Sequence, residues 1–242
     1  MSHRESLPLV GRLLTVVAAV IVAAGVTDCA RFGSATRDGS LDASLIPRLF
    51  PASRPRATLG QVMSEGVGTY IDQLLADRDS TIERWPDHVT TPLLVWIDTS
   101  SDLSGVLTHY PETVRLAFDT WQRTGIPLRF GFVTNPRLAD IRVKWTDRLP
   151  HKTGSTTWRT NHSGILTSGD ITLATHISDG YPLDARGMRA IALHEIGHAL
   201  GLSHSADTQD IMAPLVRVDQ LSAADRGTIK LLYSYPAGHL PQ

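Results

Sequence analysis

Residues 194–204 read His-Glu-Ile-Gly-His-Ala-Leu-Gly-Leu-Ser-His, and no other stretch of the chain says as much about its fold and chemistry. On a helix, side chains four residues apart lie on the same face. His194 and His198 can therefore direct two imidazoles at one metal ion, with Glu195 beside them to handle a water molecule. The glycine three residues before His204 permits a left-handed turn that brings this third imidazole back to the same point.

The donor set indicates which metal is bound. Three neutral imidazoles with an open fourth position form a catalytic zinc arrangement rather than a closed structural one. The alternative is that each histidine is an ordinary core residue, the commoner case for a single histidine on an apolar helix face. His194 and His198, however, lie in an otherwise apolar stretch, where unpaired polar groups are costly. The sequence therefore predicts zinc bound by His194, His198 and His204.

The full spacing, HExxHxxGxxH, is the signature of the metzincin clan of zinc endopeptidases. Residues 210–214, Asp-Ile-Met-Ala-Pro, resemble the methionine turn that passes beneath the zinc in this clan, with Met212 as a polarizable floor. Astacin-like and serralysin-like members carry a tyrosine two residues after that methionine. Pro214 stands there instead, and in this the chain resembles the matrixins, the family of the matrix metalloproteinases.

The resemblance extends over roughly residues 91–234. Residues 190–205 are similar to the matrixin active-site helix, and residues 221–233 to the C-terminal matrixin helix. This resemblance implies an α+β fold of the metzincin, or zincin-like, type. Such a fold has a twisted, mostly parallel sheet with an antiparallel edge strand, an active-site helix and a C-terminal helix.

Local sequence patterns predict elements in an order that fits this plan. Apolar runs, alternation and turn residues indicate one helix, which begins at a proline and ends at a glycine, among five strands. The expected strands are 93–97, 128–132, 139–145, 154–160 and 165–175, and the expected helix is 111–125. Ser222 with Asp225 three residues later is a capping pair that predicts the start of the final helix.

The resemblance implies a zinc-dependent endopeptidase, and the N-terminal segment described below predicts that it is exported. Zinc would activate a water molecule for attack on the peptide bond, and Glu195 would act as the general base and then protonate the leaving amine. A protein or peptide substrate would lie extended along residues 154–160 as an added edge strand. The alternative for this segment is a plain surface hairpin.

Two other functions compete with this interpretation. One is a non-catalytic exported binding module on a metzincin fold, which predicts loss of Glu195 or of a histidine, whereas all four residues are present. The other is a zinc hydrolase with a glutamate as third ligand on a later helix, which the position of His204 disfavours. The structural zinc and calcium sites of matrixins are not reproduced by the spacing of the remaining candidates, which we interpret as surface residues: His151, His162, His176, Asp170 and Asp179.

Composition sets broad limits on partners. The chain has 242 residues, of which 42% are hydrophobic and 19% charged, as expected for a globular protein with one sizeable core. A net charge of −1 gives no support for nucleic acid or an anionic membrane surface as a partner. We expect a monomer that contacts a membrane only through its N-terminal segment.

The N-terminus has the pattern of an export signal. Two arginines precede a fourteen-residue apolar run, 13–26, which is shorter than the about 20 residues of a membrane-spanning helix. Cys29, the single cysteine, follows this run and resembles a bacterial lipoprotein attachment site, although Asp28 departs from the small residue expected before it. Residues 23–25 offer ordinary cleavage instead. We expect a bacterial protein in the extracellular space or periplasm, with its anchoring open.

These observations divide the chain into three parts. Residues 1–29 form a signal peptide or membrane anchor, residues 30–90 a linker or pro-segment, and residues 91–242 the zinc metalloprotease domain. One helix, weakened by glycines, is expected over residues 59–78, where apolar residues recur at helical spacing. It is either a pro-segment or a docking helix. The cysteine motif that keeps matrixins latent is absent.

Overall fold

The computed structural model describes residues 57–99 and 109–242, together with the backbone of residues 16–17. The predictions about the export signal, Cys29 and residues 30–56 lie outside this part of the chain. Within it, no helix combines the length and the apolar character that crossing a membrane requires. Strand β1 (Val16–Val17) pairs antiparallel with β8 (Leu215–Val216).

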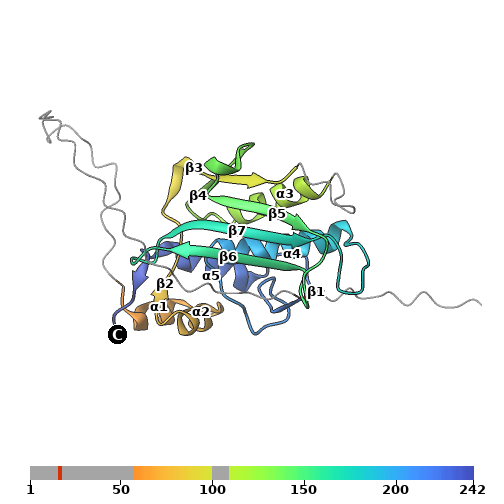
Figure 1. Cartoon of the computed structure of the whole chain (residues 1–242). Coiled ribbons are helices and arrows are strands. Elements are labelled where there is room, and N and C mark those ends of the chain that lie inside the picture. The colour runs from red at the N-terminus through yellow and green to blue at the C-terminus, as the bar shows by residue number, and fades with distance from the viewer. Residues whose placement is uncertain (1–15, 18–56, 100–108) are drawn as a thin grey trace, which may run out of the picture.

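A five-stranded sheet forms the centre of the molecule (Figure 1). Its strands, in spatial order, are β4 (Leu128–Val133), β3 (His88–Ile97), β5 (Ile141–Thr146), β7 (Leu166–Ala174) and β6 (Gly154–Thr160). The β4–β3, β3–β5 and β5–β7 pairs are parallel, whereas β6 pairs antiparallel with β7 at the edge. The predicted mostly parallel sheet with an antiparallel edge strand is therefore confirmed.

Alternating burial explains why these segments are strands. In β5 the apolar residues Ile141, Val143 and Trp145 are buried, while the polar residues between them are partly or fully exposed. Strand β5 is followed by a hairpin in which Gly154 pairs with Leu173. This hairpin leaves the outer side of β6 as the edge of the sheet.

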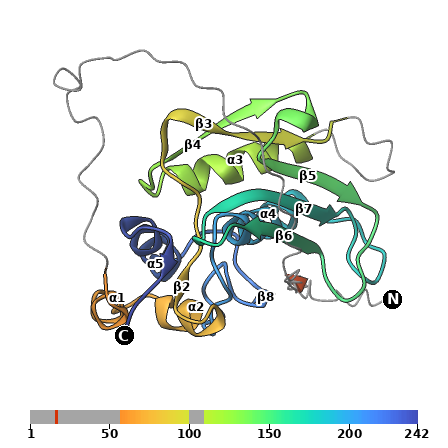
Figure 2. The same cartoon turned by 60° about the vertical axis from the view of Figure 1, so that its left-hand side comes forward.

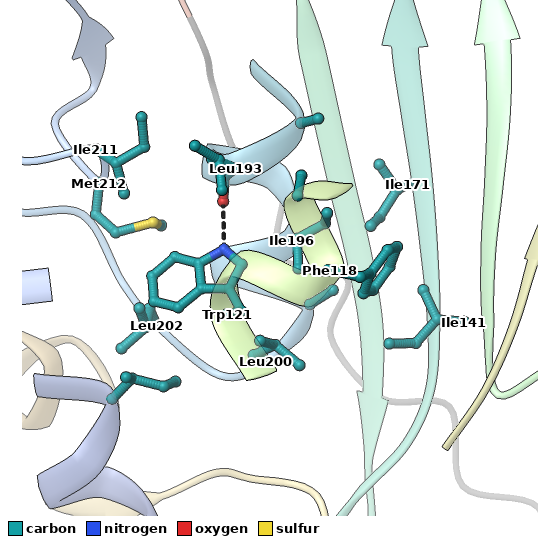
Figure 3. Packing of buried hydrophobic residues seen from close by; sticks show 14 of the residues in the cluster. Phe118, Trp121, Ile141, Ile171, Leu193, Ile196, Leu200, Leu202, Ile211 and Met212 are labelled. Atoms are coloured by element: carbon teal, nitrogen blue, oxygen red, sulfur yellow. Dashed lines mark hydrogen bonds between the residues drawn. The ribbon is translucent and has the colours of Figure 1, made fainter. Parts of the chain in front are cut away.

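Helices α3 (Tyr110–Gln122) and α4 (Ala185–Ala199) cover one face of the sheet (Figure 2). Helix α3 has a proline in its first turn, and α4 begins at Asp184, whose carboxylate accepts a hydrogen bond from Gly187 N. The Trp121 indole of α3 donates to the Leu193 carbonyl of α4 at 2.9 Å (Figure 3). This contact holds α3 against the part of α4 that carries the histidines. A 3-10 turn, Pro136–Leu138, links β4 and β5.

Helix α5 (Ala223–Ser234) completes the fold at the C-terminal side. The predicted capping pair is confirmed, because Ser222 and Asp225 bond each other's backbone reciprocally. The chain then forms β9 (Gly238–His239), which pairs with β2 (Thr81–Ile82). The N- and C-terminal parts of the described chain are thus hydrogen-bonded to each other.

The region expected to contain one helix contains two, α1 (Leu59–Glu65) and α2 (Ile71–Asp77). They lie beside α5 (Figure 2). Two glycines allow the break: a Cβ at Gly66 would overlap the Ile71 side chain, and Gly68 has a φ of +80°, which glycine adopts readily. One residue of the expected apolar stripe, Val67, falls in this turn and is 89% exposed.

Candidate metal centre and active site

Helix α4 places two histidines one turn apart on its buried face. His194 and His198 are both fully buried, and their Nε2 atoms lie 3.0 Å apart. The helix stays regular here because the residues around them are apolar and pack into the core. The two nitrogens are therefore presented by a rigid element.

The third histidine returns to the same point because of the way α4 ends. The Leu202 amide donates to the Gly197 carbonyl, and the Gly201 amide donates to the His198 carbonyl, which is the hydrogen-bond pattern of a Schellman cap. Gly201 has a φ of +104°, as this cap requires. His204 then lies with its ring centroid 4.9 Å from that of His198, as the spacing predicted.

Backbone carbonyls fix the orientation of two imidazoles. His194 Nδ1 lies 2.7 Å from the Ile211 carbonyl, and His198 Nδ1 lies 2.9 Å from the Leu202 carbonyl. Each Nδ1 must carry the proton, since a carbonyl oxygen only accepts. Both Nε2 atoms therefore hold lone pairs that face each other, an arrangement that a shared cation stabilises.

The chemistry of the site fits zinc. The three ligand nitrogens of His194, His198 and His204 all lie within 4.8 Å of one another. Burial lowers the pKa of His194 to about 3 and also lowers the pKa values of His198 and His204, so all three are neutral at pH 7. His204 Nε2 is buried without a hydrogen-bond partner among the described residues. Neutral imidazoles converging on one point are the ligands that zinc prefers.

Glu195 is held against the edge strand of the sheet. Its Oε2 accepts a hydrogen bond of 2.6 Å from Thr156 Oγ1, while its Oε1 is buried without a partner in the described part of the chain. The strand approaches so closely that a Cβ at Gly154 would overlap the carboxylate. Burial raises the pKa of Glu195 to about 8, an effect that Thr156 and the charge of Lys152 oppose.

The segment resembling a methionine turn packs beneath α4. The Met212 side chain lies beside the Trp121 indole (Figure 3), and a Cβ at Gly197 would overlap the Met212 sulfur. The Asp225 carboxylate accepts hydrogen bonds from Ile211 N at 2.9 Å and Met212 N at 3.4 Å. Asp225 was predicted only as a capping residue, and it also anchors this turn.

The remaining acidic and histidine candidates lie apart from this centre. Asp170 bonds the Arg142 guanidinium at 2.8 Å, and His176 Nδ1 lies 2.9 Å from an Asp147 oxygen. His151, His162 and Asp179 are exposed. Thr156 was missed by sequence reasoning, although its position two residues after Gly154 on the inward face of a strand was a usable signal.

Comparison with known proteins agrees with this geometry. Residues 97–234 match the family model described as Matrixin. The chain is 32% identical to human "Matrix metalloproteinase-15" over 155 residues, covering 54% of this chain and 22% of that protein. It is 45% identical to "Macrophage metalloelastase" of Oryctolagus cuniculus over 56 residues, covering 21% of this chain and 12% of the relative. The chain thus spans less than a quarter of either relative's length.

Matrixins are zinc enzymes, and the three histidines of this chain are positioned to bind a metal ion. The family match covers more than half of the chain, and it includes α4, the methionine-containing turn and α5. The fold shows the mostly parallel sheet with an antiparallel edge strand, and the two helices, that the resemblance implied. This chain belongs to the matrixin family of metzincin zinc metallopeptidases.

Proposed function

We propose that this chain is a zinc-dependent endopeptidase in which Glu195 is the general base. The observation that carries the proposal is the convergence of three neutral histidines next to a buried carboxylate that has one oxygen free. Burying a carboxyl oxygen without a partner is costly. An enzyme uses such a group for proton transfer, whereas a binding module has no use for it.

Each residue has a separate task in this proposal. His194, His198 and His204 hold the zinc through their ring nitrogens. Zinc, when bound, supplies Lewis acidity for the scissile carbonyl and lowers the pKa of water. In its ionised form, which the positive charge of bound zinc would favour against the effect of burial, Glu195 accepts a proton from the attacking water at Oε1 and passes it to the leaving amine. Thr156 Oγ1 holds the other oxygen.

The substrate is proposed to lie extended along β6. Among the described residues this strand bonds β7 on one side and no strand on the other, so its outer side offers backbone groups to a peptide. Because Thr156 and Gly154 bring β6 directly against Glu195, a peptide added to this edge would run past the general base. The plain-hairpin alternative predicts no peptide binding here.

We also infer export, so that hydrolysis takes place outside the cytoplasm. Support comes from the basic residues and the apolar run at residues 13–26. Cell fractionation of the expressed full chain tests this inference. Recovery in the cytoplasm with residues 1–25 intact would contradict it, whereas conversion to a soluble form by Cys29→Ala would identify a lipid anchor.

Glu195→Gln separates catalysis from binding. Zinc content should stay at that of the wild type, because Glu195 is not a ligand in this proposal. Peptide hydrolysis should fall at least about a hundredfold, mainly in kcat, since general acid–base groups contribute about 10²–10⁴-fold. Steady-state kinetics on a denatured protein, with metal analysis of the same samples, measures both effects.

Two further variants serve as controls. Glu112→Gln makes the same substitution at an exposed position on α3 and should leave the zinc content and the rate of hydrolysis unchanged. His204→Ala should release most of the zinc and with it the activity. Equal hydrolysis by wild type and Glu195→Gln would refute the mechanism, and absence of hydrolysis in the wild type would favour the binding module.

A further inference from the structure

The N-terminal helices share the hydrophobic core of the peptidase. Five residues of α1 and α2, or of the turn between them, are no more than 2% exposed and belong to the same cluster as the core of α4 and α5: Val62, Tyr70, Ile71, Leu74 and Leu75. Burial of apolar side chains favours the folded state roughly in proportion to the area removed from water. The helix pair is therefore packed into the molecule and is not an appended segment.

Tyr70 connects α2 to the first ligand through three hydrogen bonds in series. Its hydroxyl donates to Asp225 Oδ1 at 3.0 Å, and Oδ2 of the same carboxylate accepts from Ile211 N at 2.9 Å. The Ile211 carbonyl in turn accepts from His194 Nδ1 at 2.7 Å. The Tyr70 amide also donates to Thr228 Oγ1 of α5, which fixes the start of α2.

Gln73 connects α2 to the third ligand. Its Oε1 accepts a hydrogen bond of 2.9 Å from the backbone amide of Ala206, two residues after His204. Ala206 is exposed, so hydrophobic burial does not hold this part of the loop. Ser205, which lies between His204 and Ala206, is fixed by a 2.9 Å hydrogen bond from its amide to the Met212 carbonyl. The side chain of Gln73 thus completes the support of the loop.

The chain that follows α2 passes directly under the end of α4. A Cβ at Gly201 would overlap the Glu83 carbonyl, and the Trp85 indole donates to the Ala199 carbonyl at 2.7 Å. That carbonyl belongs to the last turn of the helix, where backbone acceptors lack partners within the helix. Removal of this segment would take the Trp85 donor from the Ala199 carbonyl and uncover Gly201 at the end of the helix.

We propose that Gln73 and Tyr70 are positioning residues for the metal site, so that α2 is a permanent part of the working enzyme rather than a removable pro-segment. This inference rests on the proposed ligation by His204 and His194. Groups that hold metal ligands in place typically change metal affinity about 10–100-fold when they are mutated. Gln73 acts through the backbone of a neighbouring residue, so its effect should lie at the lower end of that range.

The test compares zinc affinities of full-chain variants by competition with a chromophoric chelator. Gln73→Ala should raise the zinc dissociation constant about tenfold, whereas Gln73→Glu, which keeps an acceptor oxygen, should restore most of the affinity. Gln61→Ala, a matched change at an exposed position of α1, should have no effect. Unchanged affinity in Gln73→Ala, or no recovery in Gln73→Glu, would overturn the role of Gln73.

Tyr70→Phe tests the second connection with the loss of a single hydroxyl. We expect weaker zinc binding without loss of the fold, and affinity equal to that of the wild type would remove Tyr70 from the proposal. Amide hydrogen exchange of metal-free protein gives a reading that does not depend on zinc: the Ala206 amide should exchange faster in Gln73→Ala. If the wild type binds no zinc, the proposed function fails. The exchange measurement would still show whether Gln73 holds the loop after His204 through the Ala206 amide.

Discussion

Gly201 meets two separate steric demands at the end of the ligand helix. Its positive φ allows the Schellman cap that turns the chain toward His204. Its missing side chain also makes room for the Glu83 carbonyl from the N-terminal segment. The glycine of the motif therefore serves two purposes. Any other residue at position 201 would strain the backbone at its positive φ, and its side chain would collide with the Glu83 carbonyl.

Gly154 offers a residue-scale prediction about the proposed general base, Glu195. In Gly154→Ala the new methyl group must displace the Glu195 carboxylate, since the two would overlap. A misplacement of about 1 Å can cost on the order of a hundredfold in rate. We expect kcat to fall by about that factor while zinc content, measured on the same protein, is unchanged.

Gly169→Ala is the matched control for this change. Gly169 lies opposite Trp158 on the neighbouring strand, and a Cβ there would have its nearest neighbour at 3.7 Å, an ordinary contact. This variant should keep kcat within a few fold of the wild type. A larger loss in Gly169→Ala than in Gly154→Ala would show that sheet packing, and not the position of Glu195, limits the rate.

At the scale of elements, helix α4 and the turn around Met212 are fitted to each other. The turn lies close to the helix backbone only because position 197 has no side chain. On its other side the turn is held by Asp225, at the start of α5. The three elements therefore support the ligands as a unit, and a change of volume between them should affect stability.

Gly197→Ala tests this fit between elements. Alanine favours a helix over glycine by about 1 kcal/mol, but overpacking a core costs about 1–3 kcal/mol. Because the new Cβ would overlap the Met212 sulfur and approach Trp121, we expect a net loss of unfolding free energy in urea denaturation. Gly60→Ala, at an exposed helical position with free space around it, should instead be neutral or stabilising. Stabilisation by both changes would contradict the proposed packing.

At the scale of the whole molecule, the first and last described segments close on each other. Strand β2 pairs with β9, and the Leu59 amide donates to the Pro241 carbonyl at 2.8 Å. Helices α1 and α2 fill the space beside α5 (Figure 2). The described residues just before the sheet, 57–87, therefore belong to the same core as the candidate metal site.

The mature N-terminus gives a prediction at this scale. If α2 supports the ligands, any processing that leaves an active enzyme must cut before Ala57, where the core begins in the part of the chain that the structure describes. Mass spectrometry of protein recovered outside the cytoplasm should find fragments that retain residues 57–242. An active, zinc-containing form that begins after Asp77 would show that the helix pair is dispensable.

Much of the catalytic unit could be predicted from local patterns. Alternation of apolar and polar residues predicted β5, and a proline and a glycine at its expected ends predicted the helix between β3 and β4. The single helix expected over residues 59–78 was wrong in one respect: the glycines that weakened the pattern mark a real break between α1 and α2. A glycine inside a helix, such as Gly60, and a glycine at a turn, such as Gly66, look alike in sequence. Only the structure shows that Ile71 packs against Gly66, where any other residue would overlap it.

The sequence by itself predicted the family and the three histidines that the fold brings to one point, because a site built on one helix and one tight turn is encoded in local spacing that the backbone geometry converts into position. Only the tertiary structure brought Thr156 and Gly154 to Glu195, Asp225 to Ile211, and Gln73 to the loop after His204. These contacts join residues far apart in the chain. No local period records them, since they depend on how the sheet, α4, α5 and the N-terminal helices pack around one core.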